Sequence, residues 1–256
     1  PCAFRNSNVY FSRETGKHFC VPEYSAKSVE RFRLLASSHI GARDFLPGCR
    51  WLPALLDIDA PLLLPDWSPR PACVSFAKHQ AAFIPLAFQG AKKLPCREMH
   101  RPKVLFQRKT QATVVINNFS DGHYGLAGLE SLSQGLPVVV FNAEAAHEEC
   151  RLLSDTPAPW IEAGPNGHAM RDAVRRITRL PAEEYGKLRR AARAWMERCY
   201  RSKDLIARFW DPLLDELVSE QKPAEVLPRP VAPECSIVIT ARNRAPLLRV
   251  TLESIA

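Results

Sequence analysis

A chain of 256 residues with 46% hydrophobic residues has room for a buried core and for one large domain or parts of two or three. Its formal net charge of +8 favours an anionic partner: a nucleotide, a nucleic acid or an acidic membrane surface. Much of the positive charge lies in residues 171–208, however, where the helical periodicity better fits the solvent-exposed face of helices. The sequence has no signal peptide and no apolar run of membrane length, which excludes a membrane-spanning chain and leaves a protein that is at most peripheral to a membrane. Its eight cysteines are scattered and include no C-x-x-C pair, which argues against a disulfide framework and favours a cytosolic protein.

The first 50 residues contain no self-sufficient pattern beyond a helix predicted at Ser28–Leu35. A domain boundary is expected next, because residues 49–71 are rich in proline, which breaks helices and cannot join central strands. Within this stretch WLPALLDID, from Trp51 to Asp59, predicts a strand that leaves one domain and turns toward the next. The chain lacks an initiator methionine and ends at Ala256 within a helical pattern, so we expect a piece of a longer polypeptide.

A second unit begins at Ala72 with a short apolar strand, CVSFA, which is followed by Lys78. A helix-like run at 81–91, interrupted by Pro85, and a strand at Val104–Gln107 are predicted after it.

Two β-branched runs, Thr113–Ile116 and Val138–Val140, are each compact enough to be a buried strand and too short for a helix. A glycine-rich turn and a short apolar helix lie between them, which predicts a βαβ unit with two parallel strands. Ligands of such sheets bind beyond the carboxyl ends of the strands. The loop Ser120–Gly125 is therefore the first candidate for a site.

Three helices are predicted after this unit. Residues Asn166–Arg179 and Ala182–Tyr200 have apolar side chains at amphipathic spacing, and Ser202 is the expected N-cap of a third helix with a broad apolar stripe up to Leu217. The proline-rich residues 221–233 predict a semi-rigid linker. After it CSIVIT predicts a buried strand, which opens a new domain at about Pro233.

The glycines of the site loop do not match G-x-G-x-x-G, so the sequence does not favour a dinucleotide site. The loop leads into the N-terminus of a helix starting near Gly125 or Leu126, where backbone amides and the helix dipole suit a phosphate or diphosphate. Glu130, one turn into that helix, could accept hydrogen bonds from a sugar diol. The alternative is that the glycines serve only the turn and that Glu130 is a surface residue.

The segment Gly122–Val139, GHYGLAGLESLSQGLPVV, resembles a motif of two-Rossmann-domain (GT-B, family 4-like) glycosyltransferases, E-x-F-G-L-x-x-x-E-A-M-A-x-G-x-P-V-V. The resemblance implies that Glu130 holds the ribose hydroxyls of a nucleotide sugar and that the amides after Gly125 meet its diphosphate. The first motif glutamate, which contacts the transferred sugar in the family, is replaced by Gly122, whereas His123-Tyr124-Gly125 is similar to the Y-G version of this loop. Lys78 occupies the place of a lysine that neutralises the diphosphate. The implied donor-binding set is Gly122, His123, Tyr124, Gly125, Leu126, Glu130 and Lys78.

The last residues resemble a second class, the single-domain inverting (GT-A, family 2-like) glycosyltransferases, through S-I-V-I-x-x-x-N-R and L-x-x-T-L-x-S-I. In that family a metal-binding D-x-D lies further downstream, so a divalent metal is implied only for this second domain and no metal or other cofactor for the rest of the chain. The two resemblances imply an α/β fold with a Rossmann-like parallel sheet and flanking helices, accompanied by incomplete neighbouring domains. The implied division is residues 1–50, the tail of an N-terminal Rossmann-like acceptor domain; 51–71, an interdomain linker; 72–220, the donor-binding domain; 221–233, a linker; and 234–256, the start of the second domain.

The leading hypothesis is thus a glycosyltransferase module that transfers a sugar from a nucleotide-diphosphate sugar to a glycan, a lipid-linked or another hydroxyl acceptor, within a multidomain cytoplasmic enzyme of polysaccharide synthesis. We expect little turnover from this piece alone, and no catalytic residue is assigned. The alternative is a non-catalytic, donor-like scaffold beside the second transferase, motivated by Gly122. Nucleic-acid binding is not favoured, because the arginines lack interleaved aromatic residues.

Overall fold

The structure is a computed structural model of the whole chain. The structure describes residues 9–11, 14–15, 17–20, 36–37, 42–44, 48–58, 72–75, 92–93, 109, 111–117 and 122–220. Several predictions lie outside these residues: the helix at Ser28–Leu35, the helix-like run at 81–91, the strand at Val104–Gln107, Lys78, the linker 221–233 and the domain start at 234–256.

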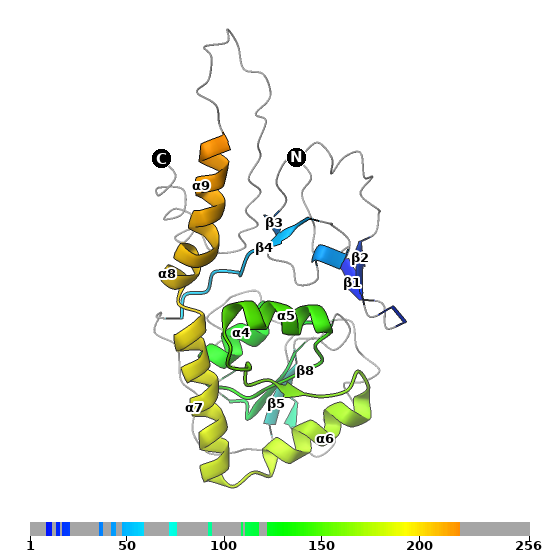
Figure 1. Cartoon of the computed structure of the whole chain (residues 1–256). Helices are drawn as coiled ribbons and strands as arrows, with labels where there is room; N and C mark the ends of the chain where they lie inside the picture. The colour runs from blue at the N-terminus through cyan, green and yellow to red at the C-terminus, as the bar shows by residue number, and fades with distance from the viewer. Residues whose placement is uncertain are drawn as a thin grey trace.

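Five short strands form one parallel sheet (Figure 1). Their spatial order is β6-β5-β7-β8-β9, and the bounds are β5 (Ala72–Ser75), β6 (Lys92–Lys93), β7 (Val114–Ile116), β8 (Val138–Val140) and β9 (Ile161–Glu162). The predicted strands around β7 and β8 are confirmed, and CVSFA overlaps β5. A parallel sheet with helices on its faces is the Rossmann-like α/β arrangement.

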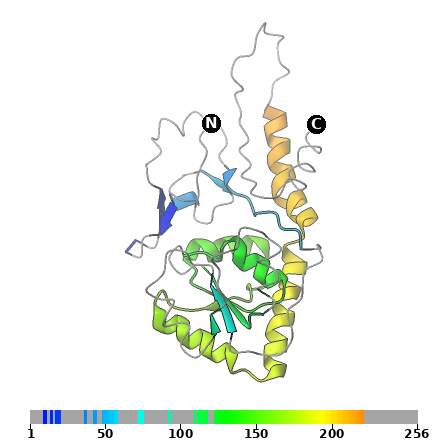
Figure 2. The same cartoon turned by 180° about the vertical axis from the view of Figure 1, so that it is seen from behind.

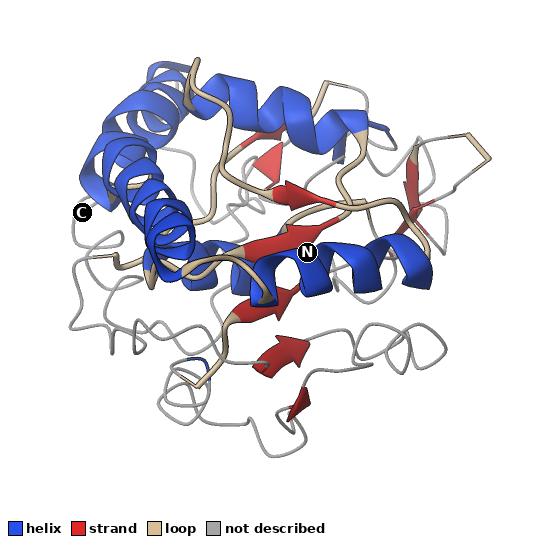
Figure 3. Ribbon diagram, turned by 90° about the horizontal axis from the view of Figure 1, so that it is seen from below, coloured by secondary structure: helices blue, strands red, loops and turns tan. Residues whose placement is uncertain are grey.

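The residues of β7 and β8 are buried on both sides of the sheet, which explains why each strand is an uninterrupted β-branched run. Val115, Val138 and Val140 belong to one core cluster, with residues of α4 (Gly125–Ser133), α5 (Glu144–Leu153) and α7 (Ala182–Cys199). Val114, Ile116 and Val139 face the other cluster, with residues of α6 (Gly167–Thr178). Figure 2 shows the resulting layers, with α4 and α5 on one side of the sheet and α6 on the other. In Figure 3 the strands lie side by side among the helices.

The helices α4, α6 and α7 lie where the sequence predicts them. Asn166 caps α6, since its side-chain oxygen accepts a hydrogen bond from the Ala169 amide at 2.9 Å. Tyr185 joins α7 to the sheet, because its hydroxyl donates to the Thr113 carbonyl at 2.8 Å. Helix α5 is an addition that the sequence patterns did not indicate.

The third predicted helix exists, but the prediction for its start was wrong. Ser202 is the first residue of α8 (Ser202–Leu205), and its hydroxyl donates to the Leu56 carbonyl at 2.7 Å instead of capping the helix. A π-helical turn, η3 (Ile206–Trp210), then leads into α9 (Asp211–Glu220). The wide π turn interrupts the register of the expected apolar stripe.

Short pairs of strands precede the sheet in the chain. Strand β1 (Val9–Phe11) is antiparallel to β2 (His18–Cys20), and β3 (Ala36–Ser37) is parallel to β4 (Arg50–Trp51). A 3-10 turn, η2 (Ala42–Asp44), lies between β3 and β4 in the chain.

The strand predicted over Trp51–Asp59 was wrong beyond Trp51, because residues 52–58 have no regular secondary structure. The carbonyls of this segment bind side chains of the C-terminal helices instead of a neighbouring strand. Trp210 donates to the Pro53 carbonyl, Ser202 to that of Leu56 and Arg193 to that of Ile58.

Candidate functional site

The strand order creates a point at which the chain connections diverge. Counted along the chain, the order is 2-1-3-4-5, so the connections that follow the neighbouring strands β5 and β7 leave in opposite directions. In open parallel sheets the crevice at such a switch point, beyond the carboxyl ends of the strands, is the usual place for a ligand. Here Asn117 follows β7, and the chain enters α4 at Gly125.

Two glycines shape the entry into α4. Gly122 has φ 62° and Gly125 has φ 55°, a left-handed backbone that favours glycine. The Gly122 carbonyl accepts a hydrogen bond from the Ala143 amide at 2.7 Å, which ties this loop to the loop after β8. The N-cap residue Tyr124 provides no side-chain cap, so the first amides of α4 have no capping side chain at that position.

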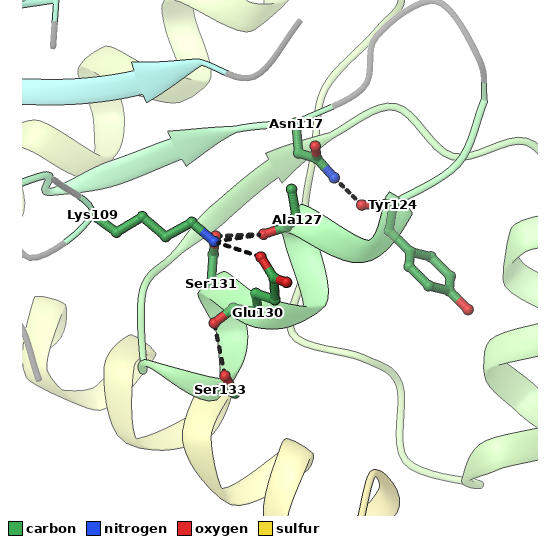
Figure 4. Close-up of polar contacts among 7 residues, drawn as sticks. All are labelled: Lys109, Asn117, Tyr124, Ala127, Glu130, Ser131 and Ser133. Atoms are coloured by element: carbon green, nitrogen blue, oxygen red, sulfur yellow. Dashed lines mark hydrogen bonds and ion pairs between the residues drawn. The ribbon is translucent and has the colours of Figure 1, made fainter. Parts of the chain in front are cut away.

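Asn117 fixes the loop against the helix. It is buried, and its Nδ2 donates to the Tyr124 carbonyl (Figure 4). A Cβ placed on Gly128 would lie 2.7 Å from this Nδ2 atom. Because Gly128 has no side chain, the Asn117 side chain has room to lie against the first turn of α4.

Tyr124 is a core residue as far as its ring is concerned. The ring is buried and stacks on Trp160 with a centroid separation of 4.9 Å, and in Figure 4 it points away from Glu130. Burial raises the pKa of the Tyr124 hydroxyl well above its usual value and raises that of the neighbouring Cys150 thiol to about 11. Only the backbone of Tyr124 is therefore available to the predicted donor-binding set.

Glu130 is engaged by a lysine that the sequence did not point to. The Nζ atom of Lys109 lies 3.2 Å from Glu130 Oε2 and 3.3 Å from the Ala127 carbonyl oxygen (Figure 4). The Lys109 side chain is fully buried, whereas that of Glu130 is 18% exposed. Burial lowers the pKa of the Lys109 ammonium, and the Glu130 carboxylate partly offsets this.

The other predicted site residues lie at the surface of the same turn. Leu126 is exposed on the first turn of α4, and His123 is half-buried just before it. The structure thus brings together Gly122, His123, Gly125, Leu126 and Glu130 around the start of α4.

Within the described residues no three His, Cys, Asp or Glu side chains are arranged to hold a metal ion. No helix in that part of the chain is both long and apolar enough to cross a membrane.

Comparison with protein-family models and with curated proteins gives no match. Among solved structures the chain is similar to spinosyn forosaminyltransferase SpnP, with 15% sequence identity and a TM-score of 0.36. The match covers 67% of this chain and 51% of that protein, so the chain spans about half of its length.

Proposed function

We propose that residues 72–220 bind the nucleoside diphosphate of a nucleotide sugar, as the C-terminal domain of a GT-B glycosyltransferase does. The observation that carries the proposal is the position of the N-terminus of α4 at the switch point of the sheet. Two glycines with left-handed backbone, Gly122 and Gly125, form the entry into this helix, and Glu130 lies on its second turn. Helix N-termini favour anionic groups, and a diphosphate is the anion that suits several successive amides.

Each part of the nucleotide sugar has a partner in this proposal. The amides of Gly125 and Leu126 bind the diphosphate, and Lys78, close to the carboxyl end of β5 in the sequence, neutralises it. The Glu130 carboxylate accepts hydrogen bonds from the ribose hydroxyls, and Lys109 holds that carboxylate in place.

The reaction is the transfer of the sugar to a hydroxyl group of a glycan or lipid-linked acceptor. The acceptor oxygen forms a bond to the anomeric carbon, the bond between that carbon and the diphosphate oxygen breaks, and the acceptor loses its proton. The amides at the start of α4 stabilise the negative charge that grows on the leaving diphosphate.

Titration calorimetry of the protein with UDP and GDP tests the proposal. We expect binding of at least one of them and a loss of about tenfold in affinity, or ~1.4 kcal/mol, in Glu130→Gln. Glu144→Gln is the matched control, because Glu144 is an exposed helical glutamate that already pairs with Arg151. Unchanged affinity in Glu130→Gln would contradict the role of Glu130.

The second candidate is a non-catalytic scaffold with a donor-like fold. The ion pair between Lys109 and Glu130 favours it, because a carboxylate with a buried partner can serve the fold alone. Absence of binding to UDP, GDP and every other nucleoside diphosphate tested would support the scaffold and contradict the transferase.

A further inference from the structure

A second polar cluster lies at the same edge of the sheet, at the carboxyl ends of β8 and β9. Glu162 is the last residue of β9, and its two carboxylate oxygens accept hydrogen bonds from Asn142, from the backbone amide at 3.3 Å and from Nδ2 at 2.9 Å. His147 of α5 places Nε2 at 3.9 Å from Glu162 Oε1. The Asn142–His147–Glu162 cluster is therefore built from three separate segments.

This cluster retains hydrogen-bonding capacity. The separation of 3.9 Å is too long for a direct hydrogen bond between His147 and Glu162. Asn142 is buried, and its Oδ1 has no hydrogen-bond partner among the residues that the structure describes. A buried amide with an unused acceptor calls for a polar occupant nearby. The side chains of His147 and Glu162 are 39% and 44% exposed, so a ligand can reach both.

The cluster adjoins the proposed diphosphate loop. Ala143, the residue after Asn142, donates its amide hydrogen to the Gly122 carbonyl at 2.7 Å. A group attached to a diphosphate at the start of α4 therefore has only a short distance to cover before it meets Glu162.

The chemistry of the cluster selects hydroxyl groups. A carboxylate repels a phosphate, and one carboxylate with an amide and an imidazole is a poor set for a hard metal ion. A hydroxyl can donate to the Glu162 carboxylate and accept from the His147 ring at the same time. Partial burial raises the pKa of Glu162 despite the hydrogen bonds from Asn142.

We propose that Glu162 and His147, positioned by Asn142, bind hydroxyl groups of the sugar carried by the nucleotide donor. The proposal rests on the proposed function and adds the residues that recognise the sugar. Gly122 has no side chain with which to bind a sugar. Glu162 is connected to the loop of Gly122 through hydrogen bonds of the consecutive residues Asn142 and Ala143, so the cluster supplies a carboxylate close to this loop.

The test compares each nucleotide with its sugar derivative: UDP with UDP-glucose, GDP with GDP-mannose, and dTDP with dTDP-glucose. We expect Glu162→Gln to weaken binding of the preferred nucleotide sugar about tenfold while the affinity for the diphosphate alone stays within about twofold. His147→Ala should have the same selectivity with a smaller loss, and it provides the measurement if Glu162→Gln fails to fold. Glu144→Gln, on the same helix as His147, should change neither affinity.

Equal losses for a nucleotide and its sugar derivative would overturn the assignment, since the cluster would then act through the fold. Unchanged affinity for every nucleotide sugar would overturn it as well. If the unsubstituted protein bound none of the six compounds, the proposed function itself would fail. If it bound diphosphates and both variants left the sugar derivatives unaffected, only the sugar assignment would fail.

Discussion

Lys109 is the residue that gives Glu130 a fixed place. Its ammonium group is buried, lies within hydrogen-bonding distance of Glu130 Oε2 and the Ala127 carbonyl, and has a lowered pKa because of that burial. A buried cation of this kind is maintained by its partners, and its removal leaves the Glu130 carboxylate without an orienting charge. If Glu130 binds the ribose as proposed, Lys109 is therefore expected to affect nucleotide binding through Glu130.

A double-mutant cycle measures this relation. Lys109→Met should weaken nucleotide binding about tenfold, or ~1.4 kcal/mol, because the Glu130 carboxylate loses its preferred orientation. In the Glu130→Gln background the same substitution should change affinity by less than about twofold. The measurement is calorimetry on the four proteins with the nucleotide that the unsubstituted chain binds. Equal losses in both backgrounds would mean that Lys109 affects the site independently of Glu130.

The end of α4 is constrained by its residues as closely as its start. Gly135 has φ 68°, and it follows the helix with the hydrogen bonds of a Schellman motif, from the Gly135 amide to the Leu132 carbonyl and from the Leu136 amide to that of Ser131. A Cβ on Gly135 would lie 3.2 Å from the backbone oxygen of Arg189 in α7. The helix therefore ends in a conformation and in a space that both favour glycine.

Gly135→Ala should accordingly lower the free energy of unfolding by about 2–3 kcal/mol, from the left-handed backbone and the contact with α7 together. Gly48→Ala is the matched control, since Gly48 also has a positive φ, 78°, but open space where a Cβ would be. We expect a loss of only about 1 kcal/mol for it. Urea denaturation of both variants measures the difference, and losses of the same size would show that the crowding against Arg189 has no energetic effect.

The elements that the sequence predicted are those with a strong local pattern. Strands β7 and β8 are continuous β-branched runs, and α6 and α7 have long amphipathic patterns, so neither depends on distant residues for recognition. Helix α5 begins after Ala143 without a capping side chain, and β9 has only two residues, so both lack such a signal.

The same distinction applies to the site. The glycine turn and Glu130 are local features of one segment, so the sequence alone is enough to name them as candidates. The partners of the site carboxylates could not, because Lys109 is 21 residues from Glu130 and Asn142 is 20 residues from Glu162. Side chains at such separations meet only through the packing of the sheet and its helices.

The C-terminal helices hold the segment that precedes the sheet. Figure 1 shows residues 50–58 passing beside α8 and α9. Trp51 packs edge-on against Phe209, and Trp210 donates to the Pro53 carbonyl at 3.3 Å. The ion pair between Arg50 and Glu216 is largely exposed and therefore contributes little by itself. The attachment depends mainly on apolar packing and on hydrogen bonds to the backbone of the segment.

Arg193 of α7 is the side chain that connects most parts of this arrangement. Its Nη1 donates to the Ile58 carbonyl at 3.2 Å and to the Ser133 carbonyl at 2.8 Å, and its Nε donates to Glu197 at 2.7 Å. One guanidinium group thus joins the segment before the sheet to the last turn of α4. Both carbonyls are at least partly buried, so water replaces the lost donor poorly.

Arg193→Met keeps the apolar stem and removes these donors, so it should lower the free energy of unfolding by about 2–3 kcal/mol. The control is Arg190→Met on the exposed face of the same helix, for which we expect a change within about 0.5 kcal/mol. Urea denaturation followed by tryptophan fluorescence suits the comparison, because Trp51 and Trp195 are buried in the core cluster that Arg193 borders.

A single transition that shifts to lower urea only in Arg193→Met would mean that segment and sheet unfold as one unit. Equal stability of the two variants would contradict the bridging role, and a second transition seen only in Arg193→Met would mean that the arginine couples two units that otherwise unfold separately.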